Sequence, residues 1–318
     1  MKIFARIVLL VVVLVVVAGE VVYQQPVWVG DQRVHFAMWR EGERSHVVTL
    51  PEGRIRYFEE AAKSNGDGTP LLLIHGLGGR SEDFANLMPQ FAAQGFHVYA
   101  LDLLGYGQSD KPADSDFSIT TEEHVVMDFM DAVHLPHAYI GAWSMGGWIA
   151  LKLALDAPQR VDRIAVYDSV GIVFQTAADT SLFAPTDGAG VARLIRTMSP
   201  TMAVPPPFVG RDIIRRLAKQ RWVIDRSITA MRTARDVVDA RLAGMQPPLL
   251  LVYGAEDVLT PPSVGATMHQ LDPRSVFATV EGCGHFLPIE CSATTAKVTV
   301  EFFKAQPAMS GGELKLSR

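Results

Sequence analysis

A run of small residues joins an apolar segment to a predicted helix at residues 140–147, Ile-Gly-Ala-Trp-Ser-Met-Gly-Gly, with Ser144 at its centre. The preceding residues 137–143 predict a buried strand, and residues 145–155 are rich in good helix formers. This junction lifts the serine hydroxyl out of a packed sheet and places it at the positive end of the new helix. The same glycines also suit an ordinary packing turn, so the junction indicates an α/β fold without identifying a function.

Two later turns carry the residues that a nucleophilic serine requires. The apolar segment 249–254 is followed by Asp257, and residues 280–285 end a predicted strand at a glycine-rich turn that carries His285. The carboxyl ends of parallel strands line one edge of a sheet, so these side chains are expected to meet Ser144 there. An imidazole activates a serine hydroxyl by taking its proton, and a carboxylate orients the imidazole. We therefore expect Ser144, His285 and Asp257 to act as nucleophile, base and orienting acid.

A fourth segment supplies backbone N–H groups. Residues 70–74 predict a strand, and the following His-Gly-Leu-Gly-Gly at 75–79 allows a sharp turn. We expect the N–H groups of Leu77 and Met145 to form an oxyanion hole. His75 is expected to hold this loop rather than to act in catalysis. Because no second histidine or carboxylate stands near it at the spacing of metal ligands, no metal is predicted.

The sequences His-Gly-Leu-Gly-Gly, Trp-Ser-Met-Gly-Gly, Gly-Ala-Glu-Asp and Gly-Cys-Gly-His together resemble the α/β-hydrolase superfamily over residues 46–306. The apolar N-terminus, the Gly-Cys-Gly-His turn and Glu290 are most similar to membrane-anchored monoacylglycerol lipases and related bacterial lipases and esterases. The resemblance implies a mostly parallel twisted sheet flanked by helices, with an inserted helical cap. It also implies a serine hydrolase that needs no cofactor. One position departs from the family pattern, since Ala142 stands where the elbow usually has glycine.

Two other carboxylates compete with Asp257 for the acid role. Asp168 follows the predicted strand 163–167, and some hydrolases of this fold place the acid there. Glu256 precedes Asp257 in the same turn and is expected to face solvent. Asp257 is favoured because it lies in the Gly-Ala-Glu-Asp turn with Pro261 behind it.

The resemblance favours a lipid ester, such as a monoacylglycerol, as the substrate. The main alternative keeps the fold and cleaves a carbon–carbon bond in a ring-cleavage product, and a haloperoxidase-like reaction is compatible with the same triad. Haloalkane and epoxide hydrolases are disfavoured because they carry aspartate at the position of Ser144. A non-catalytic ligand-binding homologue would lack a triad residue, and this sequence lacks none.

Length and composition favour one catalytic domain with an insertion. The chain has 318 residues, 48% of them hydrophobic, and its net charge of −5 argues against nucleic acid as a partner. We expect a hydrolase core over 46–170 and 246–306, a helical cap over 171–245 and a C-terminal tail over 307–318. Within the cap, amphipathic helices are expected near 188–199, 209–222 and 226–243.

The cap holds eleven Lys or Arg residues against six Asp. Solvated helix faces explain this excess better than contact with an anionic bilayer. Its apolar side chains are candidates to line an acyl pocket, although a small core within the cap is favoured for each one: Phe174, Leu182, Phe183, Ile195, Met198, Met202, Phe208 and Ile213.

Residues 1–23 decide the predicted location. As a helix, residues 3–23 span about 31 Å, which matches a hydrocarbon core of about 30 Å. An uncleaved membrane anchor is favoured over a secretory signal cleaved near Ala18. Because Lys2 and Arg6 stand at its start, the catalytic domain is expected on the periplasmic or extracellular side.

Residues 24–45 are expected to form a connector, with Trp28 and Trp39 at the membrane interface. Cys283 and Cys291 lie eight residues apart around His285. A single close pair argues only weakly for a disulfide, so buried free thiols are expected.

Overall fold

Over residues 2–63, 68–174 and 180–318, which the computed structural model describes, nine strands form one sheet in the order β1-β2-β4-β3-β5-β6-β7-β8-β9. β1 pairs with β2, and β2 with β4, in antiparallel fashion, and all other neighbours are parallel. The strands are β1 (Arg44–Leu50), β2 (Gly53–Glu60), β3 (Thr69–Ile74), β4 (Phe96–Leu101), β5 (Ala138–Trp143), β6 (Val161–Tyr167), β7 (Leu249–Gly254), β8 (Val276–Glu281) and β9 (Glu313–Ser317). The expected mostly parallel sheet is confirmed.

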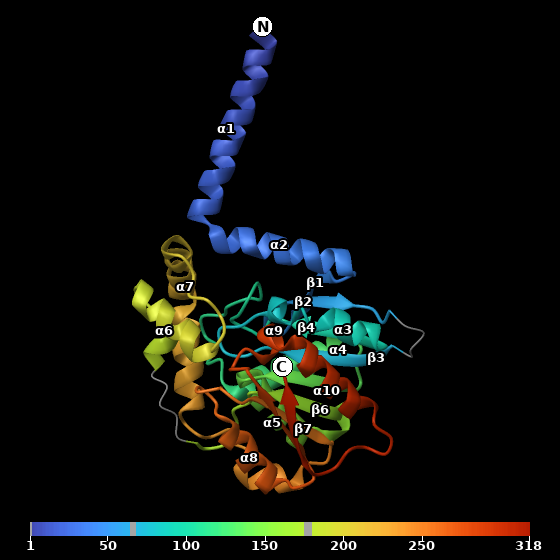
Figure 1. The fold of residues 1–318 in the computed structure, drawn as a ribbon. Coiled ribbons are helices and arrows are strands. Elements are labelled where there is room, and N and C mark those ends of the chain that lie inside the picture. Colours follow the sequence, from blue (N-terminus) through green and yellow to red (C-terminus); the bar gives the residue numbers. More distant parts are fainter. Residues whose placement is uncertain (1, 64–67, 175–179) are drawn as a thin grey trace.

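Helices cover both faces of this sheet (Figure 1). They are α1 (Lys2–Gln24), α2 (Pro26–Glu41), α3 (Met88–Ala93), α4 (Ile119–Ala132), α5 (Met145–Asp156), α6 (Gly188–Met198), α7 (Pro207–Met231), α8 (Pro262–Leu271), α9 (Leu287–Glu290) and α10 (Ser292–Lys304). Short 3₁₀ turns lie at Ser81–Phe84, Pro158–Arg160, Thr180–Phe183 and Asp239–Gly244. Because both faces are covered, a central parallel strand such as β7 is mostly apolar, and its six residues are all buried.

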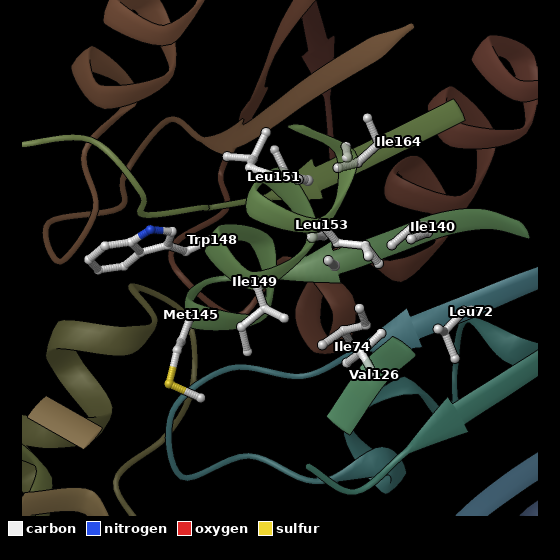
Figure 2. Close-up of a cluster of buried hydrophobic side chains, with 14 of the residues drawn as sticks. Leu72, Ile74, Val126, Ile140, Met145, Trp148, Ile149, Leu151, Leu153 and Ile164 are labelled. Carbon is white, nitrogen blue, oxygen red and sulfur yellow. The ribbon is translucent and has the colours of Figure 1, made fainter. Parts of the chain in front are cut away.

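The core against α5 fixes the element that follows Ser144. Figure 2 shows Ile149 and Leu153 of this helix pointing toward strand residues such as Ile74 and Ile140. These side chains are fully buried. Truncating any one of them to alanine would cost about 2–5 kcal/mol. The N-terminus of α5 is therefore held firmly at the edge of the sheet.

The segment between β6 and β7 carries α6 and α7, which lie beside the sheet edge in Figure 1. Two separate helices were expected near 209–222 and 226–243. Instead, the single helix α7 runs unbroken over 25 residues and covers the first and the start of the second. No proline or glycine interrupts residues 211–231, so the helix continues where a break was expected. It ends near Ala234, which has a φ of 52°.

Both chain ends contain more regular structure than expected. The connector 24–45 contains α2 and the first residues of β1, and the tail 307–318 contains β9, which extends the sheet beside β8. α1 projects away from the domain, and α2 lies across the base of α1 (Figure 1). Among the described helices, α1 alone is long and apolar enough to cross a membrane. Its segment Arg6–Gln24 has a mean hydropathy of 2.6, and none of that segment is buried against the rest of the protein.

Candidate active site

Ser144 occupies a strained turn between β5 and α5, as the sequence predicts. It is a non-glycine residue with a φ of 56° and a ψ of −120°. Its backbone N–H donates to the carbonyl of Tyr167 at 2.9 Å, and its own carbonyl accepts from Gly147 at 2.9 Å. Such backbone conformations are unfavourable and persist where the surrounding structure enforces them. Here the sheet and α5 enforce a conformation that presents the hydroxyl.

Glycines let the turn approach the loop after β3. A Cβ atom on Gly76 would lie 2.9 Å from the Cβ of Ser144, and one on Gly146 would lie 2.3 Å from the carbonyl oxygen of Ile74. Ala142, where the family elbow usually has glycine, is fully buried in β5 and keeps its register. The sheet therefore accommodates the alanine without losing the turn.

The structure brings the three predicted residues together. Ser144 Oγ lies 3.0 Å from His285 Nε2, and His285 Nδ1 lies 2.8 Å from Asp257 Oδ2. Because a carboxylate only accepts, Nδ1 carries a proton and donates it, which leaves Nε2 to accept from the serine hydroxyl. All three side chains are buried, with Ser144 the most accessible at 9%. The arrangement can deprotonate Ser144 and stabilise the resulting imidazolium.

Thr260, which the sequence analysis missed, completes the surroundings of Asp257. Its hydroxyl donates to Asp257 Oδ2 at 2.6 Å, and the N–H groups of Leu259 and Thr260 donate to Oδ1 at 2.8 and 3.0 Å. Burial alone would raise the pKa of Asp257, but the neighbouring His285 and these hydrogen bonds outweigh it and lower that pKa. Glu256 is exposed and instead accepts from the N–H of Gly282.

His75 fixes the loop that contains Leu77. The ring is fully buried, its Nδ1 donates to the Gly76 carbonyl at 2.8 Å, and its Nε2 accepts from the N–H of Leu103 at 3.0 Å. Because Nε2 accepts an N–H, the ring is neutral, and burial lowers the pKa of His75 in the same sense. These contacts agree with the structural role expected for it. Leu77 and Met145 both lie beside Ser144 in the lining of one cavity.

That cavity has a volume of about 350 Å³ and is lined mainly by apolar side chains. Its apolar lining includes Trp148, Ile172, Phe174, Phe183, Met198, Ile228, Met231, Val237 and Leu259. Of the eight apolar cap residues proposed from the sequence, Phe174, Phe183 and Met198 line it. The other five are not among the described lining residues. Phe208 instead stacks on Tyr23 of α1, with ring centroids 5.7 Å apart.

Known proteins are similar to this chain in sequence and in fold. A family model described as "alpha/beta hydrolase fold" matches residues 69–200. A solved structure of a bacterial membrane phospholipase A superposes with a TM-score of 0.79 and 25% identity, covering 95% of this chain and 98% of that one. This chain is an α/β-hydrolase-fold protein. The resemblance expected from its motifs is confirmed.

Curated relatives of this α/β-hydrolase-fold protein include two kinds of named hydrolase. Lipase 1 of Psychrobacter immobilis is 27% identical, with the match covering 78% of this chain and 80% of that protein. The 2-hydroxymuconate semialdehyde hydrolase of Pseudomonas putida is 28% identical, with coverages of 77% and 90%. The similarity supports hydrolase chemistry, and the two relatives are named for different substrates.

Cys283 and Cys291 form a disulfide in this α/β hydrolase, which corrects the expectation of free thiols. The turn after β8 and the short helix α9 reverse the chain and bring the two Cα atoms within 6.4 Å, a distance suited to a disulfide. A spacing of eight residues could not reveal this reversal. The bridge closes the loop that carries His285.

Contacts from β5 and from the end of α6 also hold the loop that carries His285. Trp143 Nε1 donates to the carbonyl of His285 at 2.7 Å, and the N–H of His285 donates to the carbonyl of Met198 at the end of α6. Glu290 accepts from the N–H of Gly284 at 2.8 Å and from the hydroxyl of Ser199 at 2.5 Å. The sequence offered no signal for the contacts to α6, because they join segments about 90 residues apart.

Among the described residues, one group of His, Asp, Glu or Cys side chains approaches the spacing of metal ligands. It consists of Asp168, Asp257 and His285, whose ligand atoms lie within 4.8 Å of one another. The hydrogen bond between Asp257 and His285 accounts for part of this proximity, and Asp168 is considered below.

Proposed function

We propose that this α/β hydrolase cleaves carboxylic esters of lipids, such as monoacylglycerols, through an acyl-enzyme on Ser144. The observation that carries the proposal is the hydrogen-bonded line from Ser144 through His285 to Asp257 at the floor of an apolar cavity. Nucleophile, base and orienting acid are the three groups that acyl transfer to a serine requires.

In the proposed reaction, Ser144 Oγ attacks the ester carbonyl carbon while His285 Nε2 takes its proton. The N–H groups of Leu77 and Met145 stabilise the oxyanion of the tetrahedral intermediate. The carbon–oxygen bond then breaks, and His285 gives its proton to the leaving alcohol. Water attacks the acyl carbon and loses a proton to His285, which releases the acid and returns the proton to Ser144. Asp257 stabilises the imidazolium in both steps.

The cavity supports a lipid acyl chain as the group bound beside Ser144. Its lining is mainly apolar, as expected for a pocket that holds hydrocarbon. The similarity to lipases points the same way, and the solved membrane phospholipase A adds phospholipids to the ester classes worth testing.

A second candidate is hydrolysis of a carbon–carbon bond in a ring-cleavage product. Two observations favour it: the similarity to 2-hydroxymuconate semialdehyde hydrolase, and Arg232. Arg232 lies in the cavity lining and makes no ion pair with any described residue, so its charge is available to a substrate carboxylate. An anionic lipid headgroup would meet the same cation.

Assays on a graded substrate set distinguish the candidates. Wild type and Ser144→Ala are compared on p-nitrophenyl esters from acetate to palmitate, a monoacylglycerol, phospholipid vesicles and 2-hydroxymuconate semialdehyde. We expect ester hydrolysis by the wild type that falls by about 10⁴-fold or more in the variant. Equal inertness of both proteins on every ester would refute the lipid ester proposal. Turnover of the ring-cleavage product alone would establish the second candidate.

We also propose that α1 anchors the protein, with the catalytic domain on the non-cytoplasmic side. The helix has 23 residues and spans about 35 Å, enough to cross a hydrocarbon core. The Cys283–Cys291 disulfide supports an oxidising compartment. The alternative is secretion after cleavage near Ala18, and an intact mass that begins at residue 1 in the mature protein would exclude it.

One face of α2 supports contact with the membrane surface. Trp28, Phe36 and Trp39 lie on this face and are 43%, 60% and 59% exposed, and the exposed Arg33 and Arg40 stand beside them. Aromatic rings with neighbouring arginines are typical of helices that lie in the interface of an anionic bilayer. We therefore extend the proposal for Trp28 and Trp39 to the whole exposed face of α2.

The opposite face of α2 binds the catalytic domain. Asp31 accepts from Arg80, just after the Leu77 loop, at 2.6 Å and from Arg216 of α7 at 2.9 Å. Burial opposes ionisation of Asp31, but the two guanidinium groups outweigh it and lower its pKa. Since the backbone N–H of Val27 also donates to Asp212 of α7, α2 joins the membrane end of the chain to the cap.

Quenching by brominated lipids tests this placement of α2. In full-length protein reconstituted into anionic vesicles, we expect lipids brominated near the headgroup to quench tryptophan fluorescence. Most of that quenching should disappear in the double variant Trp28→Phe/Trp39→Phe. Trp222→Phe removes a partly exposed tryptophan of α7 and is the matched control. This variant should retain most of the quenching. Undiminished quenching in the double variant would contradict the interfacial placement.

A further inference from the structure

Asp168 is a buried carboxyl group without a part in the proposed reaction. It follows β6 directly, and Asp257 follows the neighbouring strand β7, so the two carboxyl groups meet at one edge of the sheet. Asp168 is 0% exposed, and its φ of 44° lies in the left-handed region that a non-glycine residue adopts unfavourably. The fold thus forces this side chain toward Asp257.

Hydrogen bonds hold the backbone N–H and one carboxyl oxygen of Asp168. Its N–H donates to the Val252 carbonyl at 2.8 Å, and its Oδ1 accepts from the N–H of Gly254 at 2.8 Å. The hydroxyl of Thr260, which donates to Asp257, lies 3.0 Å from the carbonyl oxygen of Asp168. Its Oδ2 is buried and makes no hydrogen bond of ordinary geometry, although the backbone N–H of Leu287 lies close enough to the carboxyl group to favour its charged form. A carboxylate oxygen in this position would lack a well-aligned donor, whereas a protonated oxygen needs an acceptor. The acceptor at hand is Asp257, within the 4.8 Å group.

The surroundings shift the pKa values of the two carboxyl groups in opposite directions. Burial, followed by the charge of Asp257, raises the pKa of Asp168 well above its usual value and outweighs the backbone N–H groups of Gly254 and Leu287, which act in the opposite direction. The pKa of Asp257 is lowered. The titratable groups that face Asp168 are Asp257, His285 and Tyr253 of β7. Among the described residues, no lysine or arginine forms an ion pair with Asp168 that would favour its charged form. Two carboxyl groups this close rarely ionise together.

We propose that Asp168 is a neutral carboxylic acid whose Oδ2–H is donated to the carboxylate of Asp257, which makes it a positioning residue for the Asp257–His285 pair. The inference rests on the proposed roles of these two residues and of Ser144. The donated hydrogen bond shares the negative charge of Asp257 and fixes its orientation. It thereby limits how basic His285 becomes, which keeps the imidazole neutral and able to accept the serine proton near neutral pH.

Infrared difference spectroscopy tests the protonation without relying on activity. The carbonyl stretch of a protonated carboxyl group should be present in the full-length wild type at pH 7 and lost in Asp168→Asn. The matched control is Glu122→Gln, since Glu122 is another fully buried carboxyl group whose burial raises its pKa. Glu122→Gln should remove a different carbonyl band and should leave the Asp168 band unchanged. If Asp168→Asn removes no protonated-carboxyl band, the inference is overturned.

The pH dependence of kcat/KM for a p-nitrophenyl ester tests the positioning role. Asp168→Asn keeps a donor at this position, so we expect activity within about threefold of wild type and an unmoved acid limb. Asp168→Leu removes the donor and should lower kcat about tenfold to a hundredfold, the loss of one hydrogen bond to a charged group, with KM retained. Its acid limb should move to higher pH, because the unshared charge of Asp257 makes His285 more basic.

Other positions of the acid limb in these two variants would overturn the inference. If Asp168 were ionised, Asp168→Asn would remove a negative charge near His285 and move the acid limb to lower pH. If folded Asp168→Leu kept the wild-type limb, the residue would be merely structural. An inactive wild type would refute the proposed function, while the infrared measurement would still decide the protonation of Asp168.

Discussion

Replacing His285 with glutamine is expected to lower kcat for ester hydrolysis by about 10⁴- to 10⁶-fold. The imidazole Nε2 lies 3.0 Å from Ser144 Oγ, and an amide at this place cannot take the serine proton. Binding of the ester in the apolar cavity should remain, so KM should change far less than kcat. Initial rates with p-nitrophenyl butyrate, together with circular dichroism to verify folding, provide the measurement.

The matched control is His137→Gln. His137 is a half-exposed histidine that pairs with Asp162 at 2.6 Å and lies outside the site, so its replacement should change kcat less than twofold. A loss of less than tenfold in folded His285→Gln would show that another group acts as the base.

Replacing Gly146 with alanine is expected to lower the free energy of unfolding by more than about 4 kcal/mol or to prevent folding. The new Cβ would lie 2.3 Å from the carbonyl oxygen of Ile74 and 2.4 Å from that of His75. Because both contacts are backbone atoms at the end of β3, neither can move aside without disturbing the sheet and the Leu77 loop. Urea unfolding of the purified variant measures the effect.

Gly210→Ala supplies the matched control. Gly210 lies within α7, and among the described residues no heavy atom beyond its own helical turn is within 4 Å of the position its Cβ would take. Alanine should therefore leave stability unchanged or raise it by up to about 1 kcal/mol through helix propensity. Equal stabilities of the Gly146 and Gly210 variants would contradict the close approach of α5 to β3.

The sequence predicted the residues whose positions depend on strand order. Ser144, Asp257 and His285 each follow a short apolar run that predicts a buried strand of a parallel sheet. Strand ends at one edge then bring the three together regardless of their distance in sequence. The turn at Ser144 was also predictable, because small residues and glycines between a strand and a helix restrict the chain to few conformations.

Features that depend on approach between distant elements were not predictable. The Cys283–Cys291 disulfide requires the chain reversal through α9, and the continuity of α7 was hidden because its apolar spacing alone does not mark where a helix ends. The contacts of Thr260 to Asp257, and of Asp31 to Arg80 and Arg216, join side chains whose types are common on any surface. Only their burial and geometry distinguish them.

The most direct test of the account is the site of covalent modification by an alkyl phosphonate ester with a p-nitrophenyl leaving group. Ser144 Oγ would form a bond to phosphorus as p-nitrophenolate leaves, in imitation of the acylation step. We predict one adduct per chain, located on Ser144 by peptide mass spectrometry, with esterase activity lost in proportion to labelling. An adduct on a different residue, or full esterase activity with Ser144 modified, would contradict the account.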